Sequence, residues 1–184
     1  MFDSERFVED CRQAAEEGPR AIRELVAAAV ADPRGVLSAL GEPEAAGVQK
    51  LYCGPDVTVV NVIWAPFMSV MPHNHEMWAV IGVYGGAEDN IFWRRTEDGK
   101  VEAAGARALR EREVLPLGPE VVHSVMNPVD KLTGAIHVYG GDFYETARKE
   151  WDSQALTPHD HSMERTLAVF EEANRRYQLS RLEA

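Results

Sequence analysis

Two closely spaced histidines are the first residues in this chain that could do chemistry. His73 and His75 are separated by one residue in the segment Met71-Pro-His-Asn-His75. In a β-strand, residues i and i+2 face the same side, so the two imidazoles would lie together and make half of a metal site. The alternative is that both are partly exposed histidines with no ligand role, because a His-x-His pair alone is a weak signal.

A second segment, Pro116-Leu-Gly-Pro-Glu-Val-Val-His123, has a turn that leads into a strand, and Asn127-Pro128 closes that strand. Together the two segments resemble the two motifs of the cupin superfamily. The resemblance implies a third ligand, His123, and a jelly-roll barrel around one metal ion. The glutamate ligand of the general cupin pattern is missing, because Ala79 and Val80 occupy its positions. The adjacent Glu76 is too early and would face away from His75, so the predicted site has three histidines and no carboxylate.

A cupin with three histidine ligands resembles the thiol dioxygenase family, whose members oxidise cysteine or 3-mercaptopropionate at iron(II). Trp64 stands nine residues before the first ligand, as a family tryptophan does, and Ala135-Ile-His137-Val-Tyr139 is similar to the family's Ser-x-His-x-Tyr triad. The resemblance covers about residues 48–145. It implies catalytic roles for Tyr139, which would hydrogen-bond oxygen or substrate, and for His137, which would orient Tyr139.

This chain departs from the family pattern at the groups around the metal. Ala135 replaces the triad serine, and Val80 replaces the cysteine that crosslinks to the tyrosine in animal members. The family's carboxylate-binding arginine has no counterpart before Trp64. Lys50 is the nearest cationic candidate for substrate binding. Arg94 is a second one, although alternation with Arg95 allows at most one of the two to face the pocket, and a surface salt bridge is its other reading.

The elements that must position these residues can be predicted from the pattern of apolar residues. Residues 1–45 are predicted to be helical, with Ser4 capping a first helix, a break at Gly18-Pro19 and a second helix that ends at Asp32-Pro33. Residues 46–145 contain short runs rich in Val, Ile, Trp and Tyr, separated by Gly, Pro, Asn and Asp, which favours a mainly β barrel. Residues 146–184 are predicted to be a polar tail, with His159 and His161 in a loop, and then a helix.

Composition limits the classes of function. The chain has 184 residues, 45% of them hydrophobic, and a formal net charge of -11. One domain over residues 1–184 is expected, with the terminal helices packed outside the barrel. An acidic surface repels phosphate backbones, so nucleic acid is not expected as a partner. Cys11 and Cys53 have neither metal-type spacing nor the number for a disulfide framework, and no apolar run reaches membrane-spanning length. We therefore expect a cytoplasmic protein, monomeric or homodimeric.

The sequence predicts a non-haem iron(II) dioxygenase that oxidises a small thiol to a sulfinic acid with O2. Two alternatives remain open. One is a metal-binding cupin of other chemistry, such as a diketone or enediol dioxygenase using another divalent transition metal. The other is a cupin that binds a small molecule without catalysis. The pair His137 and Tyr139 favours an enzyme, because a binding protein has no need of a proton-handling pair beside the metal.

Overall fold

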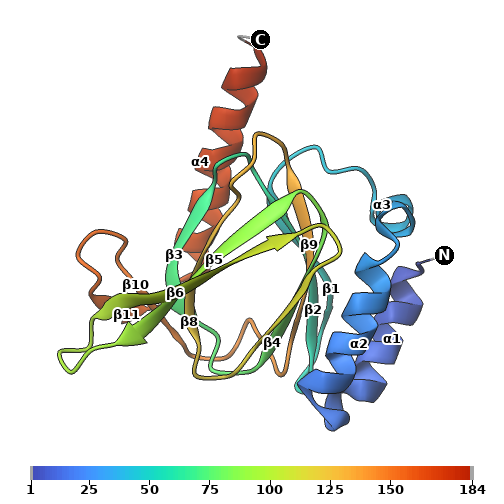
Figure 1. The fold of residues 1–184 in the computed structure, drawn as a ribbon, viewed down its shortest axis with the longest axis horizontal. Coiled ribbons are helices and arrows are strands. Elements are labelled where there is room, and N and C mark those ends of the chain that lie inside the picture. The colour runs from blue at the N-terminus through green and yellow to red at the C-terminus, as the bar shows by residue number, and fades with distance from the viewer. Residues whose placement is uncertain (1, 183–184) are drawn as a thin grey trace.

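A computed structural model describes residues 2–182, so Met1 and the last two residues of the predicted domain lie outside the described part. Within it, the strands form two antiparallel sheets that face each other as a barrel (Figure 1). The first sheet has the order β1-β2-β9-β4-β7, from β1 (Gly47–Cys53), β2 (Thr58–Trp64), β4 (Ala79–Gly85), β7 (Val114–Leu117) and β9 (Thr133–Tyr139). The predicted mainly β jelly-roll barrel is confirmed.

The second sheet has the order β11-β10-β3-β8-β5-β6. Its strands are β3 (Ser69–Asn74), β5 (Ala87–Arg95), β6 (Val101–Arg110), β8 (Val122–Met126), β10 (Lys149–Trp151) and β11 (Pro158–Asp160). The last two come from the segment 146–184 that was predicted to be a polar tail. That prediction was wrong for these residues because each strand is only three residues long, too short for a recognisable alternation.

The N-terminal helices cover the outer face of the first sheet. They are α1 (Ser4–Ala14), the 3-10 turn η1 (Ala15–Glu17), α2 (Pro19–Val30) and α3 (Pro33–Leu40). The predicted cap at Ser4 was wrong, because the carboxylate of Asp3 accepts from the Arg6 amide and Ser4 is already helical. Ile22 and Val26 of α2 pack against Val80 of β4, so the helices lie outside the barrel as predicted.

Strands β2 and β9 are buried along their whole length because both of their faces are covered. Val60 and Val62 of β2 face the barrel interior, whereas Val59 and Ile63 pack under the helices. This explains the nearly continuous apolar sequence of β2. On β9 the same alternation directs His137 and Tyr139 inward.

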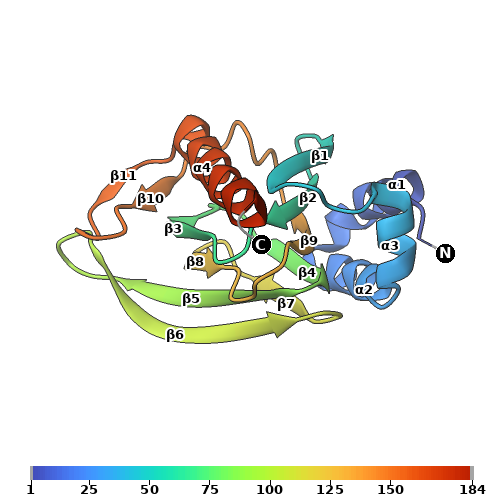
Figure 2. The ribbon, with the colours of Figure 1, turned by 90° about the horizontal axis from the view of Figure 1, so that it is seen from above.

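The C-terminal helix α4 (Met163–Leu182) passes over the space between the two sheets (Figure 2). Its buried Phe170 stacks on Trp64, with 5.4 Å between ring centroids. The amide of Asn174 accepts from the backbone N–H of Ala46 and donates to its carbonyl. Helix α4 therefore closes one end of the barrel and does not merely lie against its outside. Among the described helices, none combines the length and apolar character that crossing a membrane requires.

Candidate metal centre

The three predicted ligands converge inside the barrel. His73 on β3 is the direct cross-strand partner of His123 on β8, so their side chains lie on the same face of the second sheet. His75 follows the end of β3, just before Glu76, whose positive φ of 56° turns the chain away. The prediction placed both His73 and His75 on one strand, whereas β3 ends at Asn74. The side chain of His75 nevertheless points into the barrel.

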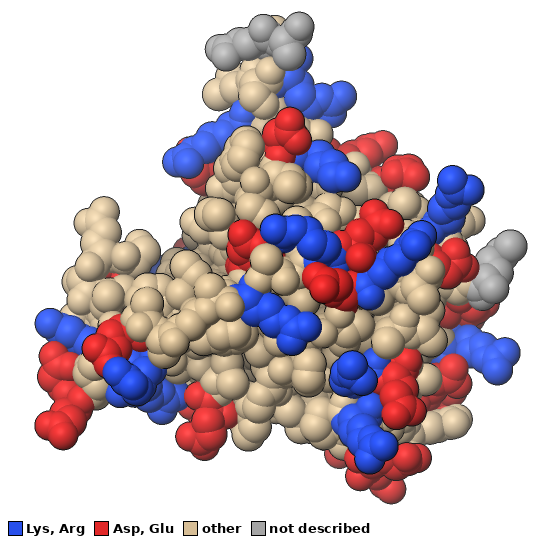
Figure 3. Space-filling model, in the orientation of Figure 1, with Lys and Arg blue, Asp and Glu red and all other residues tan. Residues whose placement is uncertain are grey.

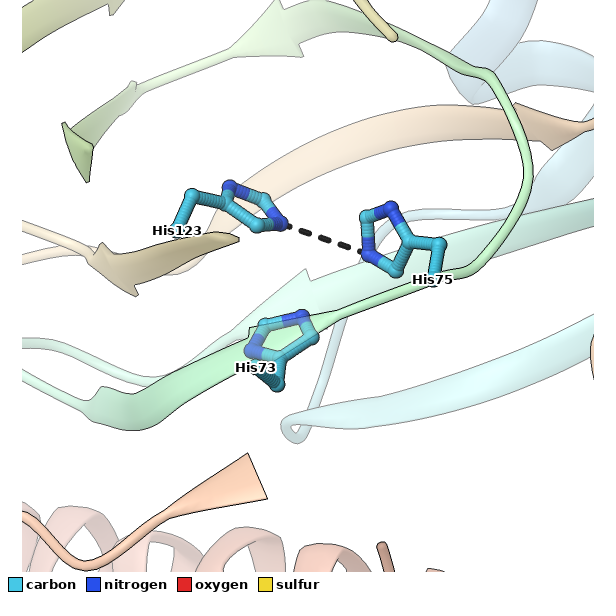
Figure 4. A group of neighbouring side chains, drawn as sticks. All are labelled: His73, His75 and His123. Carbon is cyan, nitrogen blue, oxygen red and sulfur yellow. Dashed lines mark hydrogen bonds between the residues drawn. The ribbon is translucent and has the colours of Figure 1, made fainter. Parts of the chain in front are cut away.

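The ligand atoms of His73, His75 and His123 all lie within 4.8 Å of one another (Figure 4). The Nε2 atoms of His75 and His123 are 3.3 Å apart. Two nitrogens about 2.0–2.1 Å from one metal ion, at angles between 90° and 110°, are separated by about 2.9–3.4 Å. The spacing therefore fits two ligands of one first-row transition metal.

The protonation of the rings also fits a metal ion. His73 Nδ1 lies 2.9 Å from the carbonyl of Met71, and His123 Nδ1 lies 2.7 Å from the side-chain oxygen of Asn90. Each Nδ1 must donate to its acceptor, which leaves the Nε2 lone pair free for the metal. Burial lowers the pKa of His73 to about 4 and the pKa of His75 and His123 well below the ordinary value. Neutral imidazoles are the form that binds metals.

A cavity of about 250 Å³ lies against the three histidines. Apolar side chains from both sheets and from α4 form much of its wall: Val60, Val62, Val70, Val125, Leu167 and Phe170. The histidines are among the few polar groups in this wall. This is the usual form of a small-molecule site, which is mainly apolar with a few orienting polar groups.

The predicted catalytic pair lines the same cavity. Tyr139 stacks on Phe143, and its ring centroid is 5.0 Å from that of His75. Its hydroxyl lies 3.0 Å from Nδ1 of His137. Burial raises the pKa of Tyr139, so the phenol stays protonated at neutral pH. The structure therefore brings Tyr139 and His137 together beside the metal ligands.

Glu88 is a functional candidate that the sequence prediction missed. Its carboxylate is fully buried on β5, accepts from Trp64 Nε1 at 2.9 Å and lies 3.4 Å from Nε2 of His137. A buried acid needs partners, and these come from strands distant in the sequence. One signal was available, because Glu88 and Asn90 stand two apart on a strand and so share its inward face.

Arg148 is a second candidate that was missed. It directly precedes β10, is 6% exposed, and its guanidinium lies 4.0 Å from the ring centroid of Phe143. It donates to the carbonyl of Phe143, and Nη2 lies 3.3 Å from Nε2 of His161. Its Nε has no partner among the described residues. Burial lowers the pKa of Arg148, yet an arginine stays charged.

The two predicted substrate-binding cations lie elsewhere. Arg94 is exposed and pairs with Glu102 across β5 and β6, 2.5 Å apart, so the structure does not bring it to the cavity. Lys50 is exposed on β1, with Nζ 5.2 Å from the ring centroid of Tyr144, which lines the cavity. Of the pair predicted to lie in a loop, His159 belongs to β11, whereas His161 lies between β11 and α4 and lines the cavity.

No protein-family model matches this sequence. The chain is similar to a solved RmlC-like cupin from Methanocaldococcus jannaschii, with 10% identity, a TM-score of 0.48 and coverage of 57% of this chain and 88% of that one. A protein with a double-stranded β-helix domain from Klebsiella pneumoniae is 15% identical, with a TM-score of 0.43 over 55% of this chain and 81% of that one. Oxalate decarboxylase from Bacillus subtilis is 14% identical, with a TM-score of 0.39 over 48% of this chain and 22% of that one. Each of these three similarities extends over about half of this chain.

Proposed function

We propose that the protein is an iron(II)-dependent dioxygenase that converts a small acidic thiol to a sulfinic acid. The observation that carries this proposal is the cavity lined by three neutral histidines and a protonated tyrosine, with the buried Arg148 packed against its wall residue Phe143. The reaction adds both atoms of O2 to the sulfur of a thiolate, so R–S⁻ and O2 give R–SO2⁻ without a further reductant.

The histidines His73, His75 and His123 would hold the metal on one face and leave other positions open. When bound, iron(II) supplies those positions and the electrons that activate dioxygen. The apolar wall excludes water, which strengthens each electrostatic contact inside the cavity. Tyr139 provides a hydroxyl beside His75 that can hydrogen-bond the substrate, and His137 holds that hydroxyl in place.

Arg148 supports an acidic substrate. A buried guanidinium with an unpartnered Nε costs free energy unless an anion meets it. Its planar fork suits a carboxylate better than the single charge of Lys50 would. A thiol carrying a carboxylate could then have its sulfur at the histidine end of the cavity and its acid group at Arg148.

The proposal is tested by metal analysis followed by oxygen uptake. The iron-loaded protein is mixed with 3-mercaptopropionate, cysteine, mercaptosuccinate and cysteamine. We expect oxygen consumption and sulfinic acid formation with at least one carboxylated thiol, and a weaker response to cysteamine, which has no carboxylate. Arg148→Gln should raise KM for the acidic thiols by about 10-fold to 100-fold, the size of one charged hydrogen bond, and leave KM for cysteamine unchanged.

Arg94→Gln is the matched control, because Arg94 is exposed. The KM values of this variant for all the thiols should stay at the wild-type level. Oxygen uptake that is absent with every thiol would contradict the proposal. The three-histidine set also suits zinc, nickel and copper. Purification with one of these metals and turnover of a diketone or enediol would favour the other enzymatic reading, whereas tight acid binding without turnover would favour a binding protein.

A further inference from the structure

A continuous series of side-chain contacts joins the metal ligand His123 to Tyr139 through the barrel interior. Asn90 lies 2.7 Å from His123 Nδ1 and donates from Nδ2 to Glu88 at 3.0 Å. Glu88 Oε2 lies 3.4 Å from His137 Nε2, and His137 Nδ1 lies 3.0 Å from the Tyr139 hydroxyl. The side chains that make up the series come from β5, β8 and β9 and are at least nine-tenths buried.

Glu88 is the only carboxylic acid in this series, and its neighbours favour its charged form. Trp64 Nε1 and Asn90 Nδ2 can only donate, so the two carboxylate oxygens both act as acceptors. Burial by itself would raise the pKa of Glu88. The nearby His137 and the hydrogen bonds from Asn90 and Trp64 outweigh that effect and hold the pKa of Glu88 below its ordinary value.

A charged Glu88 decides which nitrogen of His137 carries the proton. Nε2 of His137 has no well-aligned hydrogen-bond partner among the described residues, and Glu88 Oε2 is 3.4 Å from it. A lone pair on Nε2 would face a carboxylate and be repelled, so Nε2 must carry hydrogen. In the neutral ring Nδ1 then has the lone pair, and the hydrogen bond at 3.0 Å must run from the Tyr139 hydroxyl to Nδ1.

We propose that Glu88 is a positioning residue that fixes His137 as the Nε2–H tautomer and thereby makes Tyr139 a hydrogen-bond acceptor toward the cavity. The Tyr139 hydroxyl donates its proton to the hydrogen bond with His137 Nδ1. Only the lone pairs of the Tyr139 oxygen then remain for contact with a ligand. Tyr139 would therefore recognise a donor, such as an amine, a hydroxyl or a water. That last step rests on the proposed function of the cavity, whereas the tautomer does not.

Glu88 also explains how His137 can be held although Ala135 occupies the position of the serine in the Ser-x-His-x-Tyr triad. The hydroxyl that would hold His137 from its own strand is absent, and the carboxylate of β5 reaches the ring from the opposite sheet. A charged acceptor holds an imidazole N–H more strongly than a hydroxyl does. The same carboxylate holds Asn90, which orients the metal ligand His123.

The test is a measurement of histidine tautomers in the metal-free, substrate-free protein at pH 8. The protein is labelled with ¹⁵N in its histidines, and the His137→Gln variant assigns the His137 signals. We expect a pyrrole-type resonance for Nε2 and a pyridine-type resonance for Nδ1. In Glu88→Met, which removes both acceptors at similar volume, the Nδ1 resonance should shift toward the pyrrole-type position, because Nδ1–H can then donate to Tyr139.

Two further variants separate positioning from general disturbance. Trp64→Phe removes a donor to Glu88 but keeps the carboxylate, so the wild-type tautomer should persist. Glu120→Met replaces an exposed acid and should leave the spectrum unchanged. A wild-type Nδ1–H tautomer, a doubly protonated ring or an unchanged spectrum in Glu88→Met would overturn the proposal. If Glu88→Met does not fold, the wild-type and Trp64→Phe spectra decide. Loss of thiol oxidation alone, with the tautomer as expected, would reject the proposed function and not the role of Glu88.

Discussion

Asn90 is expected to control the affinity of the candidate metal site without itself being a ligand. Its side-chain oxygen accepts from His123 Nδ1 at 2.7 Å and so keeps Nε2 free to bind. Asn90→Ala should weaken iron(II) binding by about 10-fold to 100-fold, the usual effect of losing a partner of a metal-ligating histidine. Anaerobic calorimetry measures this change. Asn61→Ala, which removes an equally buried asparagine on the helix side of β2, should leave the affinity unchanged.

His161 should make folding stability depend on pH. Burial, together with the charge of Arg148, lowers its pKa from 6.5 to about 3. The unfolded chain therefore binds more protons than the folded one below pH 6.5, and the free energy of unfolding falls as the pH drops. In metal-free protein, His161→Gln should reduce the decrease in the free energy of unfolding between pH 7 and pH 5. We expect a reduction of only about 1 kcal/mol, because water screens this partly buried ring. Urea unfolding at both pH values measures it, and an equal loss in both proteins would contradict it.

The residues of the site differed in how far the sequence could predict them. His73 and His75 share a strand segment, and the motif around His123 implied the third ligand, so local pattern was sufficient. Glu88 acquires its role through a contact with His137 on the opposite sheet, which no local pattern records. Arg148 contacts Phe143, five residues away, but nothing in that spacing indicates that the arginine is buried. Arg94 was a reasonable candidate by charge, but its position on the strand directs it to Glu102 on the outside.

At the scale of elements, helix α4 closes the cavity through one aromatic side chain. Phe170 is 4% exposed and stacks on Trp64. Phe170→Ala should lower the free energy of unfolding by about 3 kcal/mol, from lost burial and an enlarged cavity. Leu179→Ala, on a part of α4 where the side chain is 60% exposed, should change it by less than about 0.5 kcal/mol. Urea unfolding compares the two, and similar values would show that α4 does not seal the barrel.

Close contact between α2 and β4 depends on a glycine. A Cβ atom added at Gly82 would lie 2.4 Å from Val26 and 2.9 Å from Val30, so α2 would have to move. Gly82→Ala should therefore destabilise the protein by about 1–3 kcal/mol. At Gly85, three residues along the same strand, an added Cβ meets nothing within 4 Å. Gly85→Ala is thus the control, and thermal unfolding should show a lower midpoint for Gly82→Ala alone.

The order and type of the long elements were predictable, because helices of α2's length and strands of β2's composition carry strong apolar patterns. Their ends were less so. Asp3 caps α1 in place of Ser4, since either side chain can accept from an amide of the first turn. The strands β10 and β11 exist because β10 pairs with β3 through Glu150 and His73, a contact between residues 77 positions apart that no local pattern records.

On the scale of the whole molecule, the helices and the barrel share buried side chains and should unfold together. The N-terminal helices pack on β4, and α4 packs on Trp64. We expect coincident urea transitions from tryptophan fluorescence and from helical circular dichroism, as for one domain over residues 1–184. Loss of the helical signal at a lower urea concentration would indicate that the N-terminal helices form a separate unit. The expected cytoplasmic location and the monomeric or homodimeric state stay predictions.

The molecule is negatively charged overall, but it holds a buried positive charge at Arg148. The chain carries a net charge of -11, and acidic and basic side chains intermingle on the face seen in Figure 3. An approaching anion is therefore repelled on average once it comes within about 8–10 Å of the surface, the screening distance of physiological salt. It meets the positive charge of the guanidinium only when it reaches the buried Arg148. Added salt should thus accelerate the arrival of an acidic ligand and slow its departure little, so the concentration of salt would govern how fast this protein captures its ligand.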